Sequence, residues 1–248
     1  MKSYFRSVAR YGFVFKRALK HPIFWMLPDE VIARIKFEFS MIRLRLAYRF
    51  KTPKVWDSNQ LVNLGCGDSG RPDWINADAF PGDGINLVYD LRKKIPLPDG
   101  IARGIFCEHF FEHLDYGDVA PRFLAECHRI LQPGGIVRII VPDAGLYLRA
   151  YVQGDWETLA KIRPLVDGQT DYWYRINYRT RMELINQVFR QGTDHKFAYD
   201  WETLQMLLKE HGFSDVTLQT FGCGKSAELC IDRPERASES LYVEAVRR

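Results

Sequence analysis

Residues 61–70, with the sequence LVNLGCGDSG, constrain the fold of this chain more than any other stretch. An apolar run that breaks into closely spaced glycines is typical of a buried parallel strand that ends in a tight turn. Because glycine has no Cβ atom, the backbone of such a turn can approach a bound nucleotide closely. We therefore expect an α/β domain with a nucleotide site at Gly65 and Gly67.

The glycines Gly65, Gly67 and Gly70 also match the G-x-G-x-x-G motif of dinucleotide-binding domains. That motif needs a helix directly after the turn, because the amides at the helix N-terminus hold the pyrophosphate. Only residues 66–73 separate the turn from the next apolar stretch, and they include Pro72. A parallel crossover usually takes about a dozen residues. A dinucleotide-dependent oxidoreductase is therefore the less favoured alternative.

A series of motifs in a fixed order points to another family. The motifs are NLGCG at 63–67, WINAD at 74–78, VYDL at 88–91, EHFFEHL at 108–114, ECHRILQPGG at 126–135 and IIVPD at 139–143. Together they resemble class I S-adenosylmethionine-dependent methyltransferases, over roughly residues 60–246. The resemblance implies a Rossmann-like α/β sheet, mostly parallel with an antiparallel last strand at the sheet edge, and S-adenosylmethionine as the cofactor.

The hydrophobic pattern predicts elements at the spacing of such a domain. We expect strands at 60–65, 74–78, 85–90, 102–107, 136–141, 216–221 and 240–246, and helices at 119–131 and 200–211. A long aromatic and charged stretch follows the fifth strand, with helices expected at 155–161 and 180–190. Connections of this length are often functional. We interpret residues 143–195 as a substrate cover within a methyltransferase domain at 56–248.

The N-terminal residues 1–55 differ in charge from the rest of the chain. They contain 13 Lys and Arg and 3 Asp and Glu, so their net charge is +10, and the remaining residues carry −6. We expect basic helices at 1–20 and 28–50. They have either of two roles, packing on the sheet or peripheral contact with an anionic membrane. No nucleic-acid recognition motif accompanies the charge, and no apolar run suits a transmembrane span or signal peptide. We therefore expect a cytoplasmic protein, with peripheral contact to the inner face of a membrane as one of the two roles open to the basic helices.

The resemblance implies the cofactor-binding residues. The turn residues Gly65, Cys66 and Gly67 would face the methionine part of the cofactor, and Asp78 would accept hydrogen bonds from both ribose hydroxyls. Asp90 and Leu91 would lie near the adenine, and Glu108 at the cofactor's edge. From the residues alone, Asp78 also suits a turn or cap, and Asp90 suits a loop entry.

Candidate catalytic residues follow strand ends, where ligands bind in open α/β sheets. We predict His109 as the general base for a hydroxyl acceptor, because imidazole titrates near neutral pH. His195 and Asp143 are the next candidates, although each histidine also suits capping or pocket lining. No metal site is predicted, because catalytic zinc usually needs three protein ligands.

The sequence therefore predicts a methyltransferase that acts on a small or membrane-proximal, lipid-linked acceptor, such as a sugar, glycolipid or isoprenoid hydroxyl. The alternative is a non-catalytic protein of the same fold that binds the cofactor or a protein partner.

Overall fold

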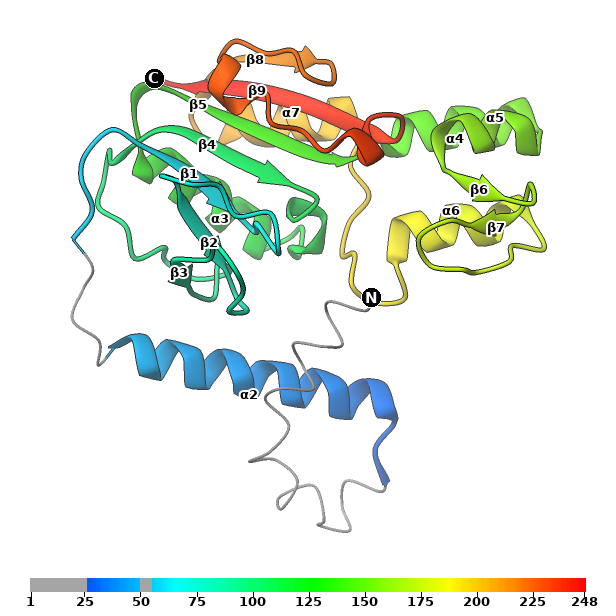
Figure 1. The fold of residues 1–248 in the computed structure, drawn as a ribbon, viewed down its shortest axis with the longest axis horizontal. Coiled ribbons are helices and arrows are strands. Elements are labelled where there is room, and N and C mark those ends of the chain that lie inside the picture. Colours follow the sequence, from blue (N-terminus) through cyan, green and yellow to red (C-terminus); the bar gives the residue numbers. More distant parts are fainter. Residues whose placement is uncertain (1–25, 50–54) are drawn as a thin grey trace.

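A mixed sheet forms the centre of the molecule, with its strands in the order β3-β2-β1-β4-β5-β9-β8 (Figure 1). The structure, a computed structural model, describes residues 26–49 and 55–248. The strands are β1 (Gln60–Leu64), β2 (Ile75–Asp78), β3 (Leu87–Val88), β4 (Ala102–Glu108), β5 (Leu131–Pro142), β8 (Phe213–Gln219) and β9 (Ser240–Arg247). All pairs among β1 to β5 are parallel, which confirms the predicted mostly parallel sheet.

The two faces of the sheet pack against different elements because successive side chains of a strand point to opposite faces. In β5, Ile139 and Val141 belong to the main hydrophobic core, whereas Ile140 belongs to a smaller cluster on the other face. Helices α3 (Val119–Ile130) and α7 (Trp201–Glu210) contribute to the main core. The short helix η4 (Ala227–Leu229) contributes Leu229 to the smaller cluster. This alternation explains why β5 is buried from Val137 to Pro142.

The connection between β1 and β2 is unusually short. Residues 65–74, all of which the structure describes, contain no helix, as the spacing predicts. The turn is held instead by β2, because the backbone N–H of Gly65 donates to the carbonyl oxygen of Ala77 at 2.9 Å. A G-x-G-x-x-G dinucleotide site therefore lacks the helix that it requires.

The last strand differs in position from the expectation. β9 is antiparallel, as predicted, but it lies between β5 and β8 rather than at the sheet edge, which β8 occupies. Several boundaries also shift: β3 is shorter, β5 begins at Leu131 directly after α3, and β8 begins at Phe213. Residues 133–135, which lie between the helix predicted at 119–131 and the strand predicted at 136–141, thus belong to β5. The cap of α7 is as predicted, since Asp200 Oδ1 accepts from the Thr203 N–H at 2.9 Å.

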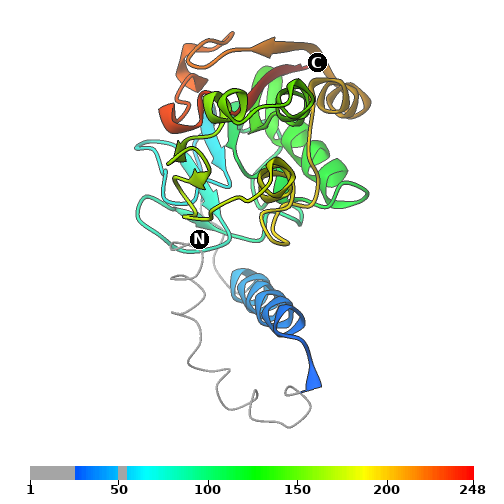
Figure 2. The same cartoon turned by 90° about the vertical axis from the view of Figure 1, so that its right-hand side faces the viewer.

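Within the predicted cover at 143–195, residues 144–190 form a unit of helices and short strands beside the ends of β4 and β5 (Figure 1 and Figure 2). From here on, the cover means residues 144–190. The cover contains α4 (Ala144–Gln153), α5 (Trp156–Ile162), β6 (Leu165–Val166), β7 (Thr170–Asp171) and α6 (Arg181–Arg190). Helices α5 and α6 lie where the sequence predicts them, but α4 and the β6–β7 pair were not predicted. The cover has its own hydrophobic cluster, which includes Tyr147, Leu159 and Tyr178.

Helix α2 (Asp29–Arg49) packs beside the loops that follow β2 and β3 (Figure 1). Met41 is buried, and the Phe37 ring lies 6.2 Å from that of Phe80. Glu38 forms a 2.6 Å ion pair with Arg92. The helix predicted at 28–50 is thus observed, whereas the one predicted at 1–20 lies outside the described residues.

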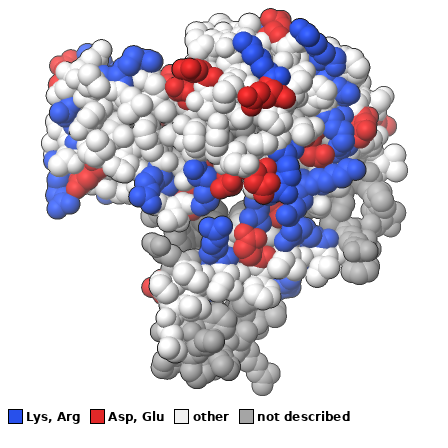
Figure 3. All heavy atoms as spheres, turned by 180° about the vertical axis from the view of Figure 1, so that it is seen from behind, with Lys and Arg blue, Asp and Glu red and all other residues white. Residues whose placement is uncertain are grey.

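Several apolar side chains of α2 are exposed. Val31, Ile42 and Leu46 are 41–51% exposed. Seen from behind, Lys and Arg side chains gather where α2 meets the domain (Figure 3). None of the helices in the described part of the chain has the length and apolar character needed to cross a membrane.

Candidate active site

The glycine turn after β1 lies against the acid at the end of β2, as the sequence predicts. Gly65 and Gly67 have φ angles of 74° and 56°, a region that glycine adopts at little cost. The Gly67 N–H donates to Asp78 Oδ2, and the Phe80 N–H donates to Asp78 Oδ1, both at 2.9 Å. A Cβ atom at Gly67 would meet nothing within 4 Å. The turn therefore has open space next to a fixed carboxylate.

These residues fit the ribose of a nucleotide cofactor. Each oxygen of an ionised carboxylate has two acceptor lone pairs. The two backbone bonds from Gly67 and Phe80 use one lone pair on each oxygen of Asp78, so capacity remains for two hydroxyl donors. Burial raises the pKa of Asp78, although the hydrogen bonds from Phe80 and Gly67 oppose this rise.

Gly65 has a second role, which the sequence does not reveal. A Cβ atom there would lie 2.2 Å from Cγ of Phe110. The Phe110 ring thus rests directly on the turn and joins it to the segment after β4. Cys66 is buried between the two glycines. Burial, aided by the charge of Asp78, raises the pKa of its thiol to about 12, so Cys66 is neither a thiolate nor a nucleophile near pH 7.

Asp90, Leu91 and Glu108 are placed differently from the expectation. The Asp90 carboxylate accepts hydrogen bonds from Arg92 Nε and Nη2 at 2.9 and 3.1 Å. Leu91 buries its side chain in the main core. Glu108 accepts from the backbone N–H and Nε of Arg233 at 2.9 and 2.6 Å. Both carboxylates are thus engaged by arginine side chains, Asp90 by a residue two positions away and Glu108 by one 125 positions away, so these contacts do not support their assignment to the cofactor.

A cavity of about 130 Å³ lies at the carboxyl ends of β4 and β5, under the cover. Ends of parallel strands are where open α/β sheets bind ligands. Polar side chains line most of it: His109, Glu112, Arg163, Gln187, Gln191, His195, Arg233 and Arg236. The cavity is adjacent to the glycine turn through Phe110, which contacts Gly65 and follows His109 directly in the chain. The turn and cavity therefore form one candidate site.

His109 lies in the cavity wall with an unusual backbone conformation. Its φ angle is 50°, which is uncommon for a residue other than glycine and is found often at functional sites. Its N–H donates to the Ile140 carbonyl oxygen at 2.8 Å. Its ring nitrogens Nε2 and Nδ1 lie 2.8 Å from Ser240 Oγ and 3.4 Å from Glu112 Oε1. The strained backbone thus aims the imidazole between a hydroxyl and a carboxylate.

His195 reaches the same wall from a segment 86 positions further along the chain. Its Nδ1 lies 2.6 Å from the Val188 carbonyl oxygen, and its Nε2 lies 3.9 Å from Glu112 Oε1. Burial lowers the pKa of His195 to about 4, so the ring is neutral near pH 7. Burial alone would raise the pKa of Glu112, but His109 and the neighbouring histidines hold it at about 2. Glu112 is therefore ionised.

Asp143 does not reach this cavity. Its Oδ1 accepts from the Leu146 N–H at 2.9 Å and caps α4. The carboxylate is thus used to satisfy the first turn of a helix that the sequence analysis did not predict. We no longer assign Asp143 a role in proton transfer.

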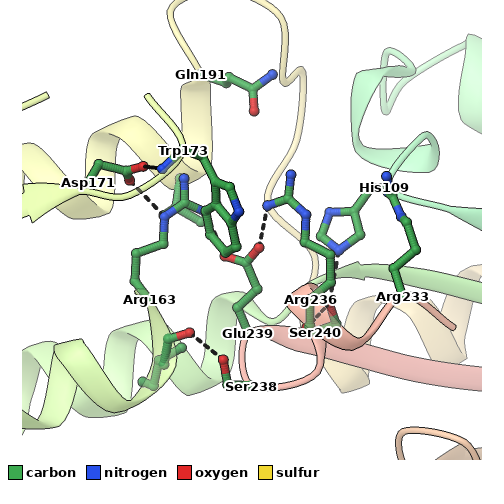
Figure 4. A network of polar contacts seen from close by, with 12 residues as sticks. His109, Arg163, Asp171, Trp173, Gln191, Arg233, Arg236, Ser238, Glu239 and Ser240 are labelled. Atoms are coloured by element: carbon green, nitrogen blue, oxygen red, sulfur yellow. Dashed lines mark hydrogen bonds and ion pairs between the residues drawn. The ribbon is translucent and has the colours of Figure 1, made fainter. Parts of the chain in front are cut away.

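A polar network on the cover side of the cavity was also missed (Figure 4). Glu239 accepts from Arg163 Nη1 at 2.7 Å, from Arg236 Nη1 at 2.5 Å and from the Tyr147 hydroxyl at 2.7 Å. Both guanidinium carbons lie 4.3 Å from the centre of the Trp173 ring. Tyr147 and Arg163 lie 92 and 76 positions from Glu239 in the chain. No local sequence pattern therefore predicts that these residues form a network.

Comparison with known proteins agrees with the sheet order and the glycine turn described above. Residues 75–139 match the family model described as a methyltransferase domain. Together with the sheet order and the glycine turn beside Asp78, the match supports a class I S-adenosylmethionine-dependent methyltransferase domain. S-adenosylmethionine is the cofactor of this class. No curated protein matches the chain significantly.

Several solved structures also resemble the chain. A SAM-dependent methyltransferase from Archaeoglobus fulgidus is 19% identical, with a TM-score of 0.45, over 89% of this chain and 100% of that one. A methyltransferase from Mesorhizobium loti is 21% identical, with a TM-score of 0.44, over 82% and 96%. The Burkholderia thailandensis 1,6-didemethyltoxoflavin-N1-methyltransferase, solved with 1,6-didemethyltoxoflavin and S-adenosylhomocysteine, is 14% identical, with a TM-score of 0.43, over 98% and 89%.

Proposed function

We propose that this chain transfers a methyl group from S-adenosylmethionine to a hydroxyl group of a small polar acceptor in the cavity under the cover. The observation that carries the proposal is the position of His109. It lies in the cavity wall, and the next residue, Phe110, contacts the glycine turn. A base next to the cofactor turn suits an acceptor whose proton must be removed.

The cofactor would bind at the turn, with Asp78 accepting hydrogen bonds from the ribose hydroxyls and the open side of Gly67 admitting the cofactor. When bound, S-adenosylmethionine would supply an electrophilic methyl group attached to a sulfonium sulfur. The sulfur would be the leaving group, as a neutral thioether, when an acceptor oxygen takes the methyl group. Without a helix after the turn, fewer amides face the cofactor's carboxylate. Asp78 therefore carries a large share of the binding.

His109 would accept the hydroxyl proton at Nε2. Ser240 Oγ lies 2.8 Å from this nitrogen and donates its own proton to the Arg236 carbonyl oxygen at 2.8 Å. The acceptor hydroxyl would therefore have to replace the Ser240 contact, with the His109 proton on Nδ1 toward Glu112, for Nε2 to act as the base. The ionised Glu112, 3.4 Å from Nδ1, favours the imidazolium that forms, in the manner of the carboxylate of a catalytic triad. The rest of the chain's contribution is alignment of the acceptor hydroxyl with the methyl group.

The acceptor class follows from the cavity lining. Gln187, Gln191 and Tyr174 offer neutral hydrogen-bonding groups at the wall, and these suit a hydroxylated molecule such as a sugar or a glycolipid head. The exposed apolar side chains of α2, such as Ile42 and Leu46, would hold the protein at a membrane surface. This contact would bring the cavity close to a lipid-linked or isoprenoid acceptor. We propose a cytoplasmic protein with this peripheral contact.

Calorimetric titration with S-adenosylmethionine, and separately with NADH, tests the proposal first. We expect saturable binding of S-adenosylmethionine only. Asp78→Ala should weaken it by about tenfold or more, since a hydrogen bond to a charged group contributes about 1.5–3 kcal/mol. Asp68→Ala, in the exposed part of the same turn, is the matched control. Binding of NADH alone, or of neither ligand, would contradict the proposal.

Methyl transfer to a panel of sugars, glycolipids and isoprenoid alcohols then separates an enzyme from a binding protein. His109→Asn should lower the rate by about 10²–10⁴-fold with little change in cofactor affinity. Cofactor binding without transfer to any acceptor would favour the non-catalytic alternative.

A further inference from the structure

Three potential metal-binding side chains meet at one side of the cavity. Glu112 and His113 lie in the short helix η3 (Phe111–His113), and His195 lies in the segment between α6 and α7. One ligand atom from each residue lies within 4.8 Å of the other two. The main chain fixes this meeting, because the Lys196 N–H donates to the Glu112 carbonyl oxygen at 2.8 Å.

Both histidine rings are oriented by backbone carbonyl groups. His113 Nδ1 lies 3.2 Å from the Asp194 carbonyl oxygen, and His195 Nδ1 lies 2.6 Å from that of Val188. A carbonyl oxygen only accepts hydrogen bonds, so each Nδ1 carries the proton and each Nε2 presents a lone pair. Metal-ligating histidines are held in this way in most sites, by a carbonyl or carboxylate on the other nitrogen.

The Glu112 carboxylate has only histidines as ion-pair partners among the described residues, with His109 Nδ1 at 3.4 Å and His195 Nε2 at 3.9 Å from its Oε1. The residue is 1% exposed, and neither carboxylate oxygen has a hydrogen-bond partner among the described residues. The nearby guanidinium groups belong to other acids, because Arg233 pairs with Glu108 and Arg236 with Glu239. Arg163 is paired with Asp171 and Glu239. A buried carboxylate without hydrogen bonds is costly unless a cation offsets it.

We propose that Glu112, His113 and His195 bind a divalent first-row transition metal ion, with zinc as the reference case. Two imidazoles and one carboxylate form a donor set that zinc uses in catalytic sites, where a fourth position stays open. Bonds of about 2.1 Å place tetrahedral ligand atoms roughly 3.4 Å apart, so the side chains must close by roughly 1.5 Å at most. This proposal replaces our expectation that the chain has no metal site, which counted residues near His109 and left out His195.

The open position would face the cavity, since all three residues line it. A metal ion there would bind an acceptor oxygen and make its proton easier to remove, with His109 Nε2 receiving that proton. This use of the ion rests on the proposed function. The binding of the ion itself does not.

Metal binding is measured directly on full-length protein that has been dialysed against a chelator. We expect one Zn²⁺ per chain by calorimetry, and visible absorption bands when Co²⁺ is added instead. Glu112→Gln, His113→Asn and His195→Asn should each weaken Zn²⁺ binding by more than about 100-fold, beyond the 10–100-fold typical of an outer-shell partner.

His211→Asn is the matched control. His211 Nδ1 also lies close to a backbone carbonyl oxygen, 2.7 Å from that of Leu207, but the residue is outside the cluster. Zn²⁺ binding that is absent in the wild-type protein, or equally strong in all four variants, would overturn the proposal. If Glu112→Gln fails to fold by circular dichroism, the two histidine variants decide the matter.

Cofactor titration of the same samples separates this proposal from the proposed function. A wild-type protein that binds S-adenosylmethionine but not Zn²⁺ would contradict only the metal site. A wild-type protein that binds Zn²⁺ but not S-adenosylmethionine would contradict only the proposed methyltransferase function.

Discussion

Gly65 shows how a single residue connects the cofactor turn to the acceptor cavity. Its backbone needs a positive φ angle, and its missing side chain makes room for the ring of Phe110. Gly67 shares the first requirement but not the second, because the space around it is open. The two glycines of one turn therefore have different physical roles.

Alanine substitutions separate these roles. Gly67→Ala should lose about 1–2 kcal/mol of unfolding free energy, the usual cost of a left-handed conformation for a residue with a Cβ atom. Gly65→Ala should lose about 1–3 kcal/mol more, because the new methyl group displaces the Phe110 ring. Urea denaturation measures both variants, and equal losses would show that Phe110 does not restrict position 65.

The carboxylates show how far residue-level prediction extends. The placement of Asp78 followed from the sequence because its partner, Gly67, lies in the adjacent strand end of a predictable sheet. Glu108 pairs with Arg233, 125 positions away, and no local pattern reveals that choice. Asp143 was misassigned because helix α4, which it caps, was not predicted.

At the scale of elements, the strands were predictable and the cover was not. Buried parallel strands are continuous apolar runs, so β1, β4 and β5 stand out in the sequence. The cover mixes aromatic and charged residues that contact one another: the Arg163 guanidinium lies over the Trp173 ring, and the Tyr178 hydroxyl donates to Asp171. Its aromatic residues therefore serve mainly as structure, although Tyr174 lines the cavity.

Helix α2 offers a test of the membrane contact. Ile42 and Leu46 of this helix are exposed, and a basic helix with an apolar side binds anionic lipid interfaces. We expect sedimentation with vesicles that contain phosphatidylserine, and weaker sedimentation with phosphatidylcholine alone. Ile42→Ser with Leu46→Ser should reduce binding several-fold.

The control for this test carries serine at Met206 and Leu218, which are similarly exposed on other elements. Equal binding of both double variants would mean that α2 does not make the contact, and a wild-type protein that stays in solution would exclude it.

At the scale of the whole molecule, buried ion pairs connect regions that are distant in sequence. Arg138 on β5 is fully buried and donates to Asp232 at 2.7 Å and to Glu244 on β9 at 2.9 Å. On the cover side, Glu239 joins Arg163 to Arg236. Removing one member of such a group leaves a buried charge unpaired. The stability of the whole chain therefore depends on the ionisation of these carboxylates.

This dependence predicts a loss of stability in acid. Burial alone would raise the pKa of Glu239, but Arg163 and Arg236 outweigh it and hold the pKa at about 2, below the ordinary value of 4.5. A carboxyl group with a depressed folded-state pKa stabilises the fold above the unfolded value and loses that contribution as the pH falls toward 2. The contribution is on the order of 3 kcal/mol.

Urea unfolding at several pH values between 6 and 2 measures this effect. Glu239→Gln should be less stable at pH 6 and should show a shallower decline in acid than the wild-type protein. Glu210→Gln, at the exposed end of α7, should leave the decline unchanged. A decline in Glu239→Gln as steep as in the wild-type protein would contradict the assignment.

The separate hydrophobic cluster of the cover has an evolutionary consequence. The cofactor turn depends on the packing of the sheet, whereas one wall of the acceptor cavity depends on residues such as Tyr147 and Leu184 of the cover. Substitutions inside the cover can thus reshape the cavity while the main core stays intact. What the cavity admits can therefore change over evolution without any change at the glycine turn.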